Sequence, residues 1–184
     1  MRAQSEGVEL TESNSEGFKV YTREWRWLEW TVAEHLAHES RSDADNIPLV
    51  VIGCGAAKAA SPQRAADLYT GSYFKLALRA ARAHVPDDRI RILSAKHGFL
   101  PLHRLVDPYD VRIGDSGSIA PSELKAQAKR CGLRDCGEVT VLAGRAYSDL
   151  ARGVWAHART PLKGTRGIGE QRHILARMAA RGVA

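Results

Sequence analysis

Residues 91–110 read RILSAKHGFLPLHRLVDPYD, in which a short apolar run breaks off into a segment crowded with reactive side chains. The apolar run, residues 90–93, ends at Ser94. Open α/β sheets bind their ligands beyond the carboxyl ends of buried parallel strands. The stretch therefore predicts a buried strand that delivers polar groups to a binding site. The alternative is a strand followed by an ordinary polar surface loop.

Two further apolar runs are typical of buried parallel strands. They are residues 48–53, PLVVIG, and residues 137–142, GEVTVL. The remaining pattern predicts helices over residues 72–84, 121–131, 145–157 and 170–181, the first with Ser72 as its N-cap. Strands that alternate with helices indicate one α/β domain, residues 47–184, with a three-layer α/β/α architecture and a mostly parallel sheet.

The N-terminal 46 residues differ in composition from the rest of the chain. Residues 1–17 are rich in Ser, Glu, Asn and Gly, and they predict a loosely docked arm. From about Thr22, apolar side chains recur at helical spacing, at positions 25, 28, 32 and 36. We therefore expect an N-terminal helical extension over residues 1–46, whose aromatic side chains pack against the α/β domain.

Composition favours a water-soluble protein with an anionic partner. The chain has 27 Lys and Arg against 21 Asp and Glu, a net charge of +6, which indicates DNA or another nucleic acid. Its three cysteines form no metal-binding pattern and suit a reducing, cytoplasmic setting. No apolar run approaches the roughly 20 residues of a membrane helix, and no secretory leader follows Met1.

Each predicted strand is followed by side chains that can bind a ligand. Because the carboxyl ends of parallel strands share one edge of a sheet, we expect these groups to line a single crevice, together with the acidic loop 107–110. The groups are Cys54 and Lys58, then Lys96 and His97, then Arg145 and Tyr147.

Several chemical roles are open at these positions. Cys54 is a nucleophile if Lys58 lowers its pKa; otherwise it lines the pocket or only fills space. The lysines suit contacts with anions. His97 and His103 suit acid or base chemistry near neutral pH, although a structural role is open for both.

Three carboxylates follow the central strand: Asp107, Asp110 and Asp115. A carboxylate activates water, or stabilises an oxocarbenium-like centre when a bond to a sugar carbon breaks. Asp110 is the first choice because it follows Pro108 and Tyr109, a rigid turn beside an aromatic ring that can stack on a base. A structural role in capping a turn is the alternative.

The segment KGTRGIG, residues 163–169, leads into the last predicted helix with three glycines and two basic residues. Free backbone N–H groups at a helix start suit a phosphate, and a flexible Gly-rich connector is the alternative. The segment matches neither a P-loop nor a dinucleotide-binding fingerprint. ATP- or NAD-driven chemistry is therefore disfavoured, and we expect no cofactor and no metal.

The spacing of these residues resembles two known groups. The motif LSA-x-x-G-F-L, residues 93–100, with Pro108-Tyr109 behind it, resembles the central motif of the YaaA peroxide-stress family. The chain is still more similar to an uncharacterised family of bacterial and phage domains, which shares Cys-x-x-x-Lys (54–58), Leu-Tyr-Thr-Gly-Ser (68–72), an LSAKYG-type segment (93–98), Pro-Tyr-Asp (108–110) and Gly-x-Gly-x-Gln (167–171). His97 stands where that family usually has Tyr.

This resemblance, over residues 48–176, implies a fold similar to the uracil-DNA-glycosylase and YaaA group, and a link to DNA damage, modified bases or phage conflict. Asp107-Pro-Tyr109 also looks like the water-activating triplet of uracil-DNA glycosylases. The leading expectation is a hydrolase: a DNA glycosylase-like N-glycosidase that removes a modified or damaged base, in DNA repair or phage defence. The alternatives are a non-catalytic nucleic-acid-binding stress protein of the same fold and a nucleoside or nucleotide hydrolase.

The expected site has three groups of residues. Asp110, Asp107 and His97 are the catalytic candidates. The substrate-binding candidates are Cys54, Lys58, Tyr69, Ser94, Lys96, Tyr109, Arg145, Tyr147, Gly169 and Gln171. Lys163, Arg166 and Arg172 are expected to contact nucleic-acid phosphates.

Overall fold

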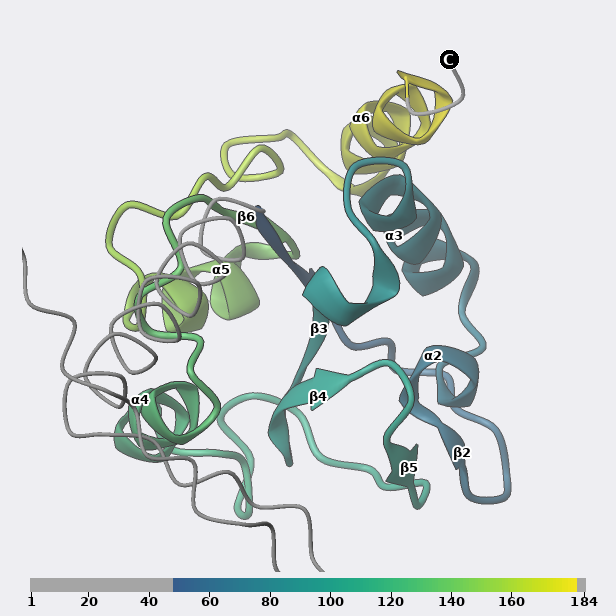
Figure 1. Ribbon diagram of the computed structural model, residues 1–184. Coiled ribbons are helices and arrows are strands. Elements are labelled where there is room, and N and C mark those ends of the chain that lie inside the picture. The colour runs from purple at the N-terminus through teal and green to yellow at the C-terminus, as the bar shows by residue number, and fades with distance from the viewer. Residues whose placement is uncertain (1–47, 182–184) are drawn as a thin grey trace, which may run out of the picture. The chain divides into compact units, whose positions relative to one another are not determined.

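The computed structural model describes residues 48–181, which form a central sheet with helices on both faces (Figure 1). The sheet has four strands in the order β4-β3-β1-β6: β4 Gly98–Pro101, β3 Ile90–Ser94, β1 Leu49–Gly53 and β6 Val139–Leu142. β1 is parallel to both β3 and β6, and β4 is antiparallel to β3. The predicted α/β fold with a mostly parallel sheet is confirmed. The arm and helix expected within residues 1–46 lie outside the described residues.

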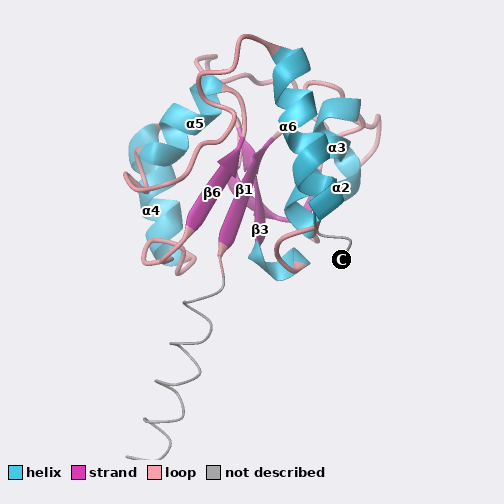
Figure 2. Cartoon of the chain, turned by 90° about the horizontal axis from the view of Figure 1, so that it is seen from above, coloured by secondary structure: helices cyan, strands magenta, loops and turns pink. Residues whose placement is uncertain are grey.

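Alternating side chains of β1 feed two separate cores. Val50 and Ile52 face a core shared with the helices α3 Ser72–Arg82 and α6 Ile168–Arg181. Leu49 and Val51 face the opposite core, which α4 Pro121–Arg130 and α5 Arg145–Arg152 cover. Figure 2 shows the three layers, with α4 and α5 on one side of the strands and α3 and α6 on the other. A strand buried on both faces explains why its sequence is a continuous apolar run rather than an alternating one.

Several local predictions were wrong. The helix expected over residues 145–157 ends at Arg152, because the chain turns so that Trp155 is buried and its indole Nε1 donates to the Leu133 carbonyl over 2.8 Å. Ser72 is not the N-cap of α3; that position belongs to Gly71, and the Ser72 hydroxyl instead accepts from Arg172. Residues 63–68, for which the sequence pattern predicted neither helix nor strand, form β2 Gln63–Arg64 and α2 Ala65–Leu68.

The chain reverses direction directly after β3 and returns as β4. The fully buried Ser94 hydroxyl accepts hydrogen bonds from the backbone amides of Lys96 (3.1 Å) and His97 (2.9 Å). Gly98 follows with φ of +70°, a conformation that favours glycine, and a Cβ there would collide with Gln127 and Ile119. The segment after Ser94, for which the sequence pattern predicted no strand, is therefore a tight turn into an antiparallel edge strand.

Gln127, from α4, occupies the outer edge of β4. Its side-chain oxygen accepts from the Phe99 amide over 2.8 Å, and its nitrogen donates to the carbonyls of His97 and Phe99 over 3.1 and 3.2 Å. The side-chain amide thus provides the hydrogen bonds that a fifth strand would supply to Phe99. At the opposite edge, β6 pairs in parallel with Arg159, which exchanges backbone hydrogen bonds with Val139 and Val141.

The remaining described elements are short. β5 Leu105–Val106 pairs antiparallel with β2, and a 3₁₀ turn, Asp87–Arg89, precedes β3. Within residues 48–181, no helix has both the length and the apolar character needed to cross a membrane.

The Gln127 contacts generate a stability prediction. We expect Gln127→Leu to lower the free energy of unfolding by about 2–4 kcal/mol, because it leaves backbone groups of His97 and Phe99 unpaired. Gln127→Glu keeps the oxygen that accepts from the Phe99 amide but loses the side-chain donor, so its effect should be intermediate. Urea denaturation measures both. A loss under about 1 kcal/mol for Gln127→Leu would contradict this account.

Candidate functional site

The carboxyl ends of β1 and β6 are joined by a contact between two side chains. Cys54 follows β1, and its Sγ lies 3.1 Å from the hydroxyl of Tyr147, in the first turn of α5. Both side chains are half-buried. The expected meeting of these two strand ends is therefore present. Because its thiol contacts a phenol, Cys54 is part of a hydrogen-bonded cluster.

A chain of three hydroxyl groups lies beside this pair. The Tyr109 hydroxyl is 2.7 Å from Ser94 Oγ, at the end of β3, and 2.8 Å from the hydroxyl of Tyr69, which follows α2. A short antiparallel bridge between Lys58 and Tyr69 holds the loop after β1 against the same segment. We call Cys54, Tyr69, Ser94, Tyr109 and Tyr147 the hydroxyl cluster.

The direction of one hydrogen bond in this chain follows from counting protons. Ser94 Oγ already accepts two amides, so its own proton is donated to Tyr109. Tyr69 is fully buried, and in its hydrogen bond with Tyr109 either hydroxyl can be the donor. The half-buried Tyr109 hydroxyl can therefore donate to a ligand or accept from one, according to the direction of this second bond.

Two lysines and a histidine surround the Tyr109 ring. Lys58 Nζ lies 4.4 Å from the ring centroid and donates to the Ala56 carbonyl over 3.3 Å. Lys96 Nζ lies 5.8 Å from the same centroid, within cation–π range. The His97 ring meets Tyr109 edge-on, with centroids 5.1 Å apart. Two ammonium groups beside a phenol favour a ligand that presents acceptor oxygens or negative charge.

Burial keeps the phenols of the cluster protonated. It raises the pKa of Tyr69 to about 12, an effect that the hydrogen bond with Tyr109 partly offsets. The pKa values of Tyr109 and Tyr147 are also raised, first by burial and then by contact with Cys54. All three phenols therefore act as neutral hydrogen-bonding groups at neutral pH.

His97 has the opposite shift. Burial, together with the positive charges of Lys96 and Arg104, lowers the pKa of its imidazole below 6.5, while the charge of Asp107 raises it. At neutral pH the ring is therefore uncharged, with one nitrogen that donates and one that accepts.

The predicted carboxylates lie outside the hydroxyl cluster. Asp107 and Asp110 are both exposed, and within residues 48–181 neither makes a hydrogen bond or ion pair. Asp107 is near enough to affect the charge of His97. The Asp115 carboxylate accepts from the Arg112 amide over 2.7 Å and so caps a turn. Asp115 therefore has the structural role that was the alternative to catalysis for a carboxylate of this segment.

His103 lies away from these residues. It lines a hollow of about 420 Å³ beside the start of β3, with Arg82, Asp87 and Arg91. This is the opposite end of β3 from Ser94, so His103 does not join the cluster.

The glycine-rich segment before α6 is held by contacts within the chain. The Arg166 amide donates to the Glu170 carboxylate over 2.8 Å, so an acidic side chain already occupies part of the predicted phosphate site. Gly169 lies in the first turn of α6, and its Cα faces open space.

Gln171 has a structural role that sequence reasoning missed. It accepts from Tyr73 over 2.8 Å and donates to Thr165 over 3.1 Å, which ties the segment before α6 to α3. Tyr73 directly follows the Leu-Tyr-Thr-Gly-Ser motif, but nothing in its sequence context indicates a partner 98 residues away.

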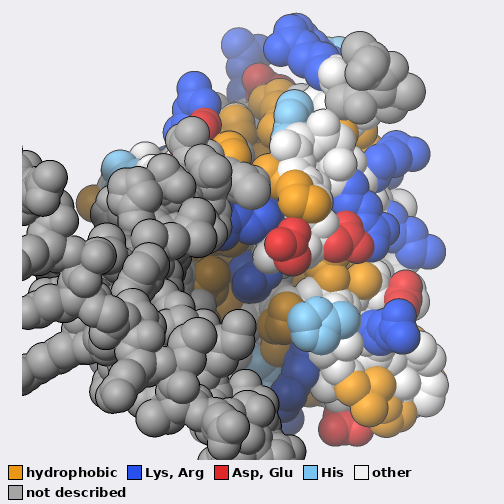
Figure 3. All heavy atoms as spheres, viewed as in Figure 1, with side chains coloured by type: hydrophobic (Ala, Val, Ile, Leu, Met, Phe, Trp, Pro, Cys, Tyr) orange, Lys and Arg blue, Asp and Glu red, His pale blue; other side chains and the backbone are white. Residues whose placement is uncertain are grey.

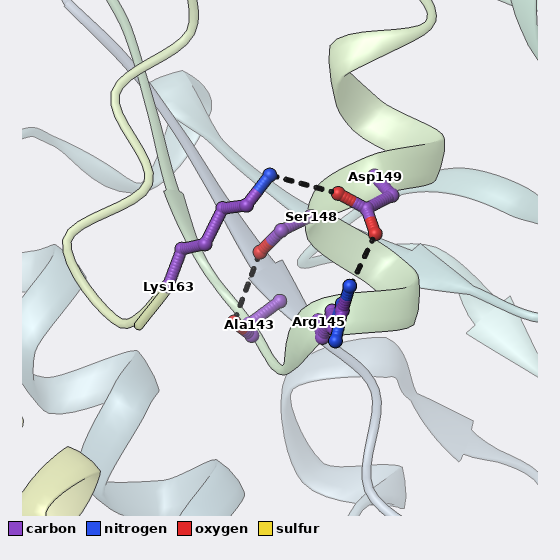
Figure 4. A network of polar contacts seen from close by, with 5 residues as sticks. All are labelled: Ala143, Arg145, Ser148, Asp149 and Lys163. Atoms are coloured by element: carbon purple, nitrogen blue, oxygen red, sulfur yellow. Dashed lines mark hydrogen bonds and ion pairs between the residues drawn. The ribbon is translucent and has the colours of Figure 1, made fainter. Parts of the chain in front are cut away.

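The remaining predicted cations lie on the surface. Lys163 and Arg145 both approach Asp149, with N–O distances of 3.2 and 3.9 Å, as Figure 4 shows. Arg172 contacts the Ser72 hydroxyl at 3.3 Å. On the face seen in Figure 3, Lys and Arg side chains are interspersed with acidic and apolar ones. Arg145 therefore points to an ion pair on α5 rather than to the hydroxyl cluster.

The chain belongs to a family of unknown function, DUF6884, whose model matches residues 49–177. No curated protein matches the sequence. The matched region contains the whole sheet, the hydroxyl cluster and most of α6.

The raised pKa of Tyr69 predicts a loss of stability in alkali. An unfolded Tyr69 ionises at about pH 10 and the folded one at about pH 12, so its contribution is complete below pH 10 and is lost as pH rises to 12. We expect a decrease of about 3 kcal/mol in the free energy of unfolding over this range. Urea denaturation at successive pH values measures it, and the slope should be shallower in Tyr69→Phe. An unchanged slope would contradict the assignment.

His97 should titrate below pH 6.5 in an NMR titration of its imidazole signals, because burial and neighbouring cations disfavour the charged ring. Lys96→Gln should raise the midpoint by removing one of these cations. Lys75→Gln, an exposed lysine on α3 that is not among the causes of the shift, is the matched control and should leave the midpoint in place. A wild-type midpoint above 6.5 would overturn the assignment.

Proposed function

We propose that the protein is an N-glycosidase that removes a modified or damaged base from DNA, with the hydroxyl cluster as its base-binding site. The observation that carries the proposal is the convergence of Tyr109, His97, Lys58 and Lys96 at the carboxyl end of β3. Aromatic rings and hydrogen-bond donors suit a heterocyclic base, and ammonium groups suit the attached phosphate. The resemblance to YaaA and uracil-DNA-glycosylase proteins supports the same assignment.

A base inside a duplex cannot reach such a site, so the target nucleotide would be flipped out of the stack. The Lys58 ammonium lies over one face of the Tyr109 ring, so the base would use the other face of Tyr109 or the ring of His97. With the base stacked on His97, the Tyr109 hydroxyl would donate a hydrogen bond to an acceptor atom at the edge of the base. This contact orients the base and favours the negative charge that it acquires on leaving.

The chemical step is a hydrolysis. The bond between sugar C1′ and the base nitrogen breaks, water adds its oxygen to C1′, and one water proton leaves while the base nitrogen gains a proton. Asp110 or Asp107 would accept the proton of the attacking water or stabilise the cationic sugar. Neutral His97 would donate an N–H hydrogen bond to the departing base. His103, which lies by the start of β3, has no part in this step.

A second function is favoured by one observation. Asp107 and Asp110 are exposed and make no hydrogen bond or ion pair with the hydroxyl cluster. A protein that only binds nucleic acid requires the lysines and the aromatic rings but no carboxylate. The second candidate is therefore a non-catalytic nucleic-acid-binding protein that uses the same surface.

The two candidates predict different results for carboxylate variants. Purified protein would be incubated with oligonucleotides that each carry one modified base, and alkali-labile abasic sites would be counted. For the N-glycosidase we expect Asp110→Asn or Asp107→Asn to slow release of the base by about 100-fold or more, with DNA affinity retained. Asp115→Asn is the matched control, because its carboxylate caps a turn in the same segment, and it should retain the wild-type rate.

Absence of abasic sites across the whole panel would overturn the enzyme assignment. If Lys58→Gln then still weakens a salt-dependent affinity for DNA, the binding function stands in its place. If the wild-type protein shows no salt-dependent affinity for DNA, both candidates are wrong.

A further inference from the structure

A hollow lined by cationic side chains lies on the side of the sheet that α4 and α5 cover. A hollow of about 350 Å³ is bordered by α4 and by the turn that follows α5. Three of the lining side chains are cationic and none is acidic. The lining residues are Lys125, Ala126, Lys129, Arg134, Gly153 and Val154.

The carboxylates of the neighbouring helices have other partners. Asp149 on α5 binds Lys163 and Arg145 (Figure 4). Glu123 on α4 accepts from the Ala120 amide over 3.0 Å. Among residues 48–181, no ion pair involves any of the three cations that line the hollow. These three cationic groups are therefore available to a bound anion.

The larger hollow near the start of β3 provides a contrast. Its lining includes three aspartates, and Arg82 there pairs with Asp87 at 2.8 Å. In the larger hollow Arg82 is thus neutralised by a neighbouring carboxylate. The cations of the smaller hollow have no such partner in its lining.

The two walls of the basic hollow are held together by Trp155. Its buried indole donates to the carbonyl of Leu133, the residue before Arg134, and its backbone follows Val154. Gly153 provides space on the same wall: a Cβ there would lie 3.0 Å from the Leu150 carbonyl oxygen and 4.0 Å from Lys125 Cε. The alkyl chain of Lys125 therefore lies close against the turn after α5. These contacts fix the two walls of the hollow relative to each other.

We infer that this hollow binds phosphate, and that the phosphate belongs to a nucleic-acid backbone. α5 begins where β6 ends and Gly153 follows the end of α5, so the hollow lies a helix length away from the hydroxyl cluster. It would hold a stretch of backbone remote from the base that is bound. The assignment of this phosphate to a nucleic acid rests on the proposed function. The anion site itself is argued only from the cationic side chains that line the hollow.

Phosphate binding can be tested by NMR with pyrophosphate as the probe. The full chain labelled with ¹⁵N would be titrated with pyrophosphate, and in a second arm with a short single-stranded DNA. The Gly153 amide and the Trp155 indole N–H, assigned with Trp155→Phe, are the reporters. We expect both signals to move in a saturable manner in both arms.

Neighbouring residues on α4 provide a matched pair of variants. Lys129 lines the hollow, whereas Arg130 lies in the same last turn and does not. We expect Lys129→Gln to weaken pyrophosphate binding about tenfold and to reduce the salt dependence of DNA binding by about one phosphate contact. Arg130→Gln should change pyrophosphate affinity by less than about twofold.

The outcomes separate the sources of phosphate. Movement of the reporters with pyrophosphate but not with DNA would keep the phosphate site and overturn the nucleic-acid assignment. Equal effects of Lys129→Gln and Arg130→Gln, or no movement with pyrophosphate, would overturn the site. Because the readout involves no base release, a failure here is distinct from a failure of the proposed N-glycosidase activity.

Discussion

The hydroxyl of Ser94 fixes both the end of the central strand and the chemistry next to it. By accepting two backbone amides it closes the turn from β3 to β4, and this leaves its own proton for Tyr109. The Tyr109 hydroxyl also shares a hydrogen bond with the buried Tyr69. Chain reversal and the hydrogen-bonding character of the site therefore depend on one buried oxygen. Alanine at this position would remove both together.

The predictable part of the fold was the part encoded by continuous runs of sequence. Buried parallel strands such as β1 are apolar along their whole length, so the strands and the layer order follow from the sequence. β4 was missed because the turn before it is closed by the Ser94 side chain, and its outer edge by Gln127, which lies 28 residues after Phe99. Partners this distant leave no local pattern. The first 46 residues stay a prediction.

The candidate site divides in the same way. The rule that parallel strands end at one edge anticipated the contact between Cys54 and Tyr147. The pairing of Tyr69 with Tyr109 depends on how the loops fold over that edge, which residue spacing does not define. Exposure of Asp107 and Asp110 is likewise a property of packing. Sequence supplied the residue types near the site, and only the structure supplied which of these side chains share a hydrogen bond.

The two edge strands of the sheet, β4 and β6, limit how this domain can pair with a strand of another chain. Gln127 occupies both backbone polar groups of Phe99 on β4, and Arg159 occupies the carbonyl of Val139 and the amide of Val141 on β6. Exposed strand borders normally invite pairing with a foreign strand, the route to β-augmentation and to aggregation. Here those groups are already occupied at both borders. Protein partners must therefore recognise side-chain surfaces of the domain, because a lengthened sheet would first require Gln127 or Arg159 to be displaced.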